Sequence, residues 1–174
     1  DGTVFSTQTL QAIEQITTMG WQVPYSSRVD SISNFQYTHA EGDDLIVQDL
    51  YRDAKSLTVK EVRKLKSIAL TEPLLVNKLI SPEGNVAGIN ITVQLPGKSP
   101  ETEMPKITIA VNKIADEIRQ QYPQIDVYMT GIVLLNDAFF SASMKDMSTL
   151  VPLTFLVILI AIGLFLRSWT SIFS

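Results

Sequence analysis

Residues 150–166 read LVPLTFLVILIAIGLFL, and 13 of these 17 residues are Leu, Ile, Val or Phe. No charged side chain occurs from Met147 to Leu166. As an α-helix the quoted run is about 25 Å long, and the whole uncharged segment is about 30 Å long, which is the thickness of a bilayer's hydrocarbon core. Transfer of each of these apolar side chains into a bilayer is favourable by about 0.3–0.6 kcal/mol. The run therefore predicts a membrane-spanning helix.

A helix buried in a protein core is the alternative explanation for this run. A domain of about 150 residues seldom surrounds so long an uncharged helix on every side, which disfavours that alternative. The position of the run, far from the N-terminus, excludes a cleaved signal peptide.

The rest of the chain has the composition of an acidic globular domain. The 174 residues carry 14 Lys and Arg against 18 Asp and Glu. Only Arg167 follows Asp146 among the charged residues, so residues 1–146 hold 13 basic and 18 acidic side chains, a net charge of −5. This charge argues against nucleic acid as a partner, because phosphate binding requires a basic surface. With no Cys and one His, disulfides, Cys/His zinc sites and Cys–His catalysis are excluded.

Apolar periodicity predicts several helices and strands in the acidic part. Helical spacing occurs at residues 7–19, after a Thr58–Glu61 capping box, and at residues 102–122, and Pro73 suits the first turn of a short helix ending near Leu79. Strands are expected at residues 29–35, 88–95 and 125–129, the second with strict alternation of apolar and polar side chains. A short apolar piece covers residues 45–47, and from Leu134 the chain is expected to be helical into the membrane span.

This order is helix, strand, two inserted helices, strand, long helix, strand. One further strand before residue 1 would complete a βαββαβ arrangement. We therefore expect an α+β, ferredoxin-like split βαβ subdomain whose first strand is missing, followed by a transmembrane α-helix.

Two groups of residues are candidates for a functional site. His39, Glu41, Asp43 and Asp44 are the only cluster that resembles metal ligands, but their spacing lacks the calcium-loop pattern and suits a turn, so no metal, cofactor or catalytic residue is predicted. Phe139, Phe140 and Met144 precede the uncharged run. They fit either helix packing and interfacial anchoring or a surface that meets a lipid-like substrate, and they are our candidate substrate path.

Six stretches, taken in order, resemble one known family. They are VFSTQTLQAIEQI, RVDSISNFQYT, DDLIVQDL, EPLLVNKLISPEGNVAGINITVQL, VYMTGIVLLNDAFF and LFLRSW. Together they resemble the extracytoplasmic loop and second membrane helix of resistance-nodulation-division (RND) exporters, most closely the bacterial branch related to MMPL and sterol-sensing-domain proteins. The most specific parts are Val29-Asp30-Ser31 with Asn34-Phe35, and FLRSW at residues 165–169.

The resemblance implies a proton-driven exporter of hydrophobic or amphiphilic, lipid-like compounds, and not an enzyme. It places the chain in the bacterial inner membrane, with residues 1 to about 140 periplasmic. The implied partners are the lipid bilayer, the substrate and the remaining segments of a longer parent protein, and a homo-oligomer is also allowed. Proton-relay residues of such exporters lie in other membrane helices, and none is expected on this chain.

The resemblance also divides the chain. A porter domain is expected at residues 1–133 with a helical insertion at about 57–80, a membrane-proximal helix at 134–146, the membrane helix at 147–169 and a cytoplasmic start at 170–174. A membrane-anchored sensor or receptor domain, or a protein-export accessory subunit, is the alternative that composition leaves open.

Overall fold

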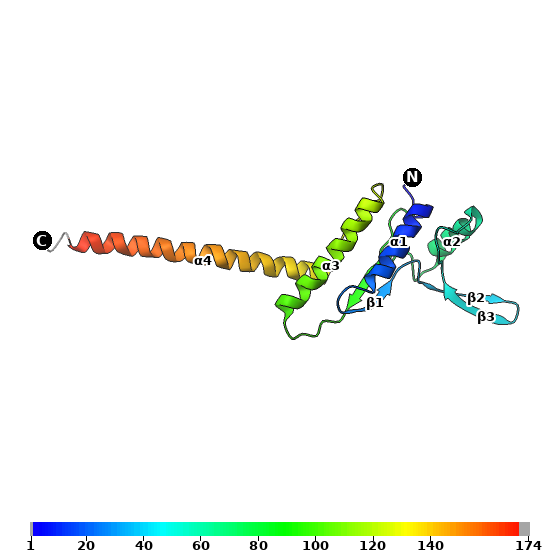
Figure 1. Cartoon of the computed structure of the whole chain (residues 1–174), viewed down its shortest axis with the longest axis horizontal. Coiled ribbons are helices and arrows are strands. Elements are labelled where there is room, and N and C mark those ends of the chain that lie inside the picture. Colours follow the sequence, from blue (N-terminus) through cyan, green and yellow to red (C-terminus); the bar gives the residue numbers. More distant parts are fainter. Residues whose placement is uncertain (1, 171–174) are drawn as a thin grey trace. The chain divides into compact units, whose positions relative to one another are not determined.

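The computed structural model of the chain describes residues 2–170, and of residues 41, 100 and 167–170 it describes the backbone alone. Residues 171–174, most of the expected cytoplasmic start, lie outside the described part. The chain divides into two units, Asp1–Met129 and Thr130–Ser174 (Figure 1).

The first unit is an α+β arrangement, as expected. Its described elements are α1 (Thr7–Gly20), β1 (Ser26–Asp30), β2 (Gln36–Glu41), β3 (Asp44–Asp49), α2 (Val59–Thr71), β4 (Asn90–Val93) and α3 (Pro100–Gln121). The strands form two separate antiparallel pairs, β1 with β4 and β2 with β3.

The β1–β4 pair joins two segments that the ferredoxin-like expectation also makes neighbours. Val29 lies opposite Ile91, and Asp30 lies opposite Asn90. Helix α1 ends close to this pair, because a Cβ added at Gly20 would lie 3.2 Å from side-chain carbons of both Val29 and Ile91. A larger residue at position 20 would therefore press on both side chains, which would have to shift by a few tenths of an ångström.

The strand predicted at residues 29–35 is wrong after Asp30. The chain bends there because Asn34 hydrogen-bonds to the backbone on both sides of the bend: its Oδ1 accepts from the Ser31 N–H at 2.9 Å, and its Nδ2 donates to the Val29 carbonyl at 2.7 Å. The buried Ser31 hydroxyl also contacts Ser33 and accepts from Thr17 of α1, each at 2.8 Å. Side-chain bonds of this kind compete with a sheet ladder.

A β-hairpin, which the sequence analysis did not predict, follows this bend. Strands β2 and β3 pair from Gln36 with Asp49 to Glu41 with Asp44. The two-residue turn has Gly42 at φ +63°, a conformation that suits glycine and that a type II′ turn requires at its first position. The expected apolar piece at residues 45–47 therefore lies within β3.

The core of the first unit lies between α1, α2 and the segments after the strands. Leu10, Ile32 and Leu75 are fully buried in it. The Tyr51 hydroxyl donates to the Leu10 carbonyl at 2.9 Å. Burial, together with the nearby Glu14 carboxylate, raises the pKa of Tyr51 far above its ordinary value, so the hydroxyl keeps the proton that this bond needs. The Glu14 carboxylate also accepts from the backbone N–H groups of Asp53 and Ala54.

Helix α2 begins with the predicted capping box, in which Thr58 Oγ1 accepts from the Glu61 N–H and the Glu61 carboxylate accepts from the Thr58 N–H. The short helix predicted to end near Leu79 is wrong. Asn77 has φ +61° there, and Ile80 makes isolated bridges with Val76 and Ala87. A residue in the left-handed region interrupts a right-handed helix.

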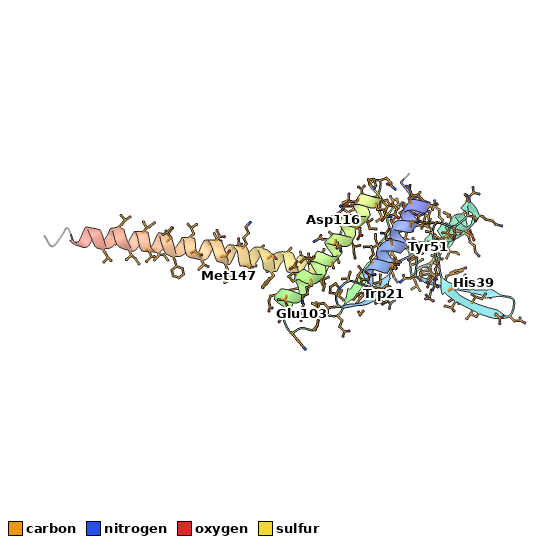
Figure 2. The ribbon with its side chains drawn as sticks, viewed as in Figure 1. Trp21, His39, Tyr51, Glu103, Asp116 and Met147 are labelled. Atoms are coloured by element: carbon orange, nitrogen blue, oxygen red, sulfur yellow. The ribbon has the colours of Figure 1, made fainter. Side chains whose placement is uncertain are left out.

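Helix α3 begins at Pro100, two residues before the expected start. The buried carboxylate of Glu103 accepts backbone N–H groups from Gly97, Lys98 and Ser99 at 3.0–3.2 Å (Figure 2). These bonds fold the preceding Pro/Gly segment over the first turn of α3.

The strand predicted at residues 125–129 is also wrong, because no strand pairs with it in the described part of the chain. The segment keeps the alternation of a strand all the same. Ile125, Val127 and Met129 are half-buried, whereas Asp126 and Tyr128 are exposed. The Arg119 guanidinium donates to the Val127 carbonyl at 2.6 Å. This side-chain bond is not part of a ladder, and the segment pairs with no strand in the described part of the chain.

Candidate membrane span and substrate path

The second unit contains one long helix, α4 (Ile132–Thr170), of 39 residues. It includes both the membrane-proximal segment and the predicted membrane helix without a break. The part Ile132–Leu166 is long enough to cross a membrane, and the mean hydropathy of its most apolar 18-residue stretch is 2.7. Within it, residues 147–166 form the uncharged segment, about 30 Å long as a helix.

The side chains of the uncharged segment are exposed along the whole helix. None of its most apolar window is buried within the described chain. Leu159, Leu164 and Phe165 are 65%, 65% and 77% exposed. By its length and composition α4 is therefore a candidate membrane span.

Pro152 lies inside α4 and is tolerated there. Proline lacks an N–H group, so the carbonyl four residues earlier loses its helical donor. Two hydroxyls near Pro152 bond to the backbone of the preceding turn, Thr154 to the Leu150 carbonyl at 2.7 Å and Ser148 to the Lys145 carbonyl at 2.8 Å. Such internal bonds keep hydroxyl groups satisfied in an apolar environment.

The three candidate substrate-path residues lie on two faces of α4. Phe140 and Met144 are four residues apart and share one face, whereas Phe139 is a third of a turn away, on the face of Leu135. Phe139 is 75% exposed, Met144 51% and Phe140 39%. The helix therefore offers two adjacent apolar faces beside the uncharged segment, with Phe139 on one and Phe140 on the other.

The polar cluster around His39 lies on the β2–β3 hairpin (Figure 2). The His39 ring stacks on Tyr37 with centroids 5.3 Å apart, and its Nδ1 has no hydrogen-bond partner in the described chain. Asp43 is in the turn and Asp44 begins β3, and both are exposed. Among the described residues, no three His, Asp or Glu side chains are grouped closely enough to hold a metal ion.

Comparison with known protein families gives a match over nearly the whole chain. The model of the MMPL family matches residues 7–173. The chain belongs to the MMPL family. This MMPL match confirms the resemblance inferred from the six quoted stretches. Comparisons of this MMPL chain with curated proteins and with solved structures gave no match.

Membership in the MMPL family gives α4 a functional setting. Proteins of this family are membrane transporters, and the family suggests export of lipid-like compounds. The apolar α4 fits a membrane protein. The sequence feature that indicates a membrane protein is the uncharged run at residues 147–166, which was identified from the sequence alone. Sequence analysis found the apolar piece at residues 45–47 but not the hairpin that exposes Leu45 and Val47, because apolar residues lie on both of its faces and no clean alternation marks its strands.

Proposed function

We propose that this chain is part of a proton-driven RND-type exporter of hydrophobic or amphiphilic, lipid-like compounds, to which it contributes a porter subdomain and one membrane helix. The observation that carries the proposal is the combination of an MMPL match over residues 7–173 with an uncharged helical segment of bilayer length. The proposed location is the bacterial inner membrane, with the first unit on the periplasmic side.

The pairing of β1 with β4 supports the porter role, because a ferredoxin-like subdomain makes these two strands neighbours. In the same arrangement a further strand would lie between β4 and residues 125–129. We expect another segment of the parent protein to supply that strand. It would pair with the backbone groups that lack a ladder in residues 125–129.

Proton coupling has to use other helices of the parent protein. Residues 147–166 contain no Asp, Glu, His, Lys or Arg, so this segment of α4 has no side chain that could carry a proton across the membrane. The proposed contribution of α4 is therefore a hydrophobic surface, beside which Phe139, Phe140 and Met144 meet substrate that leaves the bilayer.

The test uses the intact parent protein reconstituted in liposomes that contain a fluorescent fatty-acid analogue. An imposed proton gradient should drive movement of the analogue, and a protonophore should abolish that movement. Liposomes without the protein are the control. Movement that is unaffected by collapse of the gradient would contradict proton coupling. Absence of movement, together with specific binding of a small molecule to the first unit, would favour the membrane-anchored sensor instead.

A further inference from the structure

The β2–β3 hairpin lies at one end of the first unit (Figure 1) and has apolar side chains exposed to solvent. Leu45 is 71% exposed and Val47 is 56% exposed. Their cross-strand partners are Ala40 and Thr38, so the four side chains share one face of the hairpin. An exposed apolar face on a two-stranded hairpin tends to pair with another protein surface.

The same hairpin is strongly acidic. Residues 41–49 contain Glu41, Asp43, Asp44 and Asp49 and no Lys or Arg, which gives a net charge of −4. Asp49 forms an ion pair with Arg52 at 2.7 Å. Asp43 and Asp44 are exposed and make no ion pair within the described part of the chain. The tip therefore combines two free carboxylates with an apolar face.

Helix α2 carries the opposite charge in an otherwise acidic domain. Residues 59–71, which form α2, hold four basic side chains and one acidic side chain, a net charge of +3. Lys60, Arg63 and Lys64 have the spacing of one helix face, and all three are exposed. Within residues 2–170 none of the three forms an ion pair with a carboxylate. Val59, at the start of the helix, is 71% exposed, so this basic surface also has an apolar neighbour.

We propose that the hairpin of one copy of this chain docks on helix α2 of a second copy. The acidic tip would meet Lys60, Arg63 and Lys64, and Leu45 and Val47 would cover the apolar surface around Val59. A second copy accounts for both surfaces at once, because every copy carries one of each. Binding of α2 to anionic lipid would satisfy the basic residues alone and leave the apolar face of the hairpin uncovered. The proposal does not depend on what the protein transports.

The first experiment uses cysteine cross-linking of the full chain in lipid nanodiscs that hold several copies. The chain has no cysteine, so each introduced thiol reports a single site. Leu45→Cys and Val59→Cys are placed in separately tagged copies, which are then mixed and mildly oxidised. A disulfide that joins the two tags is expected. The matched control pairs Leu45→Cys with Ile109→Cys on α3, a site 68% exposed, and should give far less product. Equal yields from the two pairs would overturn the proposal.

The second experiment reverses the charges. Asp43→Lys with Asp44→Lys, or Lys60→Glu with Arg63→Glu and Lys64→Glu, should each lower the cross-linked fraction by roughly tenfold, and so should a rise from about 0.1 to about 1 M salt. Mixing the reversed hairpin with the reversed helix should restore cross-linking. All five positions are exposed, and circular dichroism checks that each variant folds. Loss with the helix variant but not with the hairpin variant would assign α2 to an anionic lipid surface and overturn the proposal.

Discussion

At the scale of single residues, Asn34 belongs to a hydrogen-bond network that connects the bend after β1 with α1. Its amide bonds to the backbone of Val29 and Ser31, and the Ser31 hydroxyl continues the network to Thr17 on α1. The bend after β1 is therefore fixed to the helix that covers it. This network gives a physical reason for the VDSISN stretch, which contributed to the resemblance to RND exporters.

Replacement of Asn34 by Ala should lower the free energy of unfolding by about 1–3 kcal/mol, because a backbone N–H and a carbonyl lose their partners. Urea unfolding of the full chain in detergent, followed by near-ultraviolet circular dichroism, measures the change. Asn112→Ala is the matched control, since Asn112 is exposed on α3. Equal midpoints for the two variants would show that the amide of Asn34 does not stabilise the bend.

Ionisation of Glu61 makes the stability of the first turn of α2 depend on pH. Hydrogen bonds from the Thr58 hydroxyl and then from the Thr58 N–H lower the pKa of Glu61 below its ordinary value of 4.5. The ionised form is therefore favoured in the folded helix. Its contribution is complete above the ordinary pKa and is lost as the pH falls through the lowered value in the folded chain.

In the wild-type chain, we expect the Thr58 amide to lose protection from hydrogen exchange as the pH falls below the lowered pKa of Glu61. Glu61→Gln keeps an acceptor for the Thr58 N–H but cannot ionise, so the protection of the amide in this variant should not change over the same range. Nuclear magnetic resonance measures both protection factors in detergent. Identical pH curves for the two proteins would contradict a role of the Glu61 charge.

At the scale of elements, the proposed substrate path lies on α4. Phe139 and Phe140 occupy adjacent faces of the helix just before the uncharged segment. In the intact exporter, replacement of both by Ala should reduce export roughly tenfold, the effect of about 1.4 kcal/mol of lost apolar contact. The measurement is export of the fluorescent analogue from proteoliposomes at equal protein abundance.

The size-matched control is Phe155→Ala with Phe165→Ala, two residues inside the uncharged segment of the same helix. This control should reduce export less than the Phe139 and Phe140 variant. If abundance falls in step with export for the latter, the two residues serve packing and the substrate-path prediction fails.

The elements also show what local pattern can and cannot predict. Helices α1, α2 and α3 follow from the spacing of their apolar residues, because helical hydrogen bonds join residues that are close in sequence. Residues 125–129 have the alternation of a strand but no partner strand among residues 2–170, and a ladder requires one. The hairpin at β2 and β3 was missed because apolar residues lie on both of its faces, Ile46 on the half-buried one and Leu45 and Val47 on the exposed one, so no alternation marks the strands. The span is predictable from composition alone, since lipid imposes its own length.

At the scale of the whole molecule, the proposed topology places the first unit in the periplasm and the end of α4 at the cytoplasmic side. Arg167 is the only charge after the uncharged segment, so the positive-inside signal rests on a single residue. A Lys113→Cys variant, exposed on α3, should react with an impermeant maleimide in intact spheroplasts. A Ser168→Cys variant should react only after lysis. The reverse pattern of labelling would place the first unit in the cytoplasm and contradict the proposed topology.

The continuity of α4 has a mechanical consequence. Residues 132–146 continue the membrane helix for about 22 Å beyond its uncharged segment as part of one helix, in which Pro152 removes one backbone hydrogen bond. A helical extension of this length acts as a lever arm where it follows the span, so a tilt of the span by about 10° would displace its far end by about 4 Å. Gly131, with φ at +138°, stands directly before that end and supplies a backbone geometry that few other residues adopt. Small changes in the slope of the helix within the bilayer are thereby amplified into movements of ångström size at residue 131.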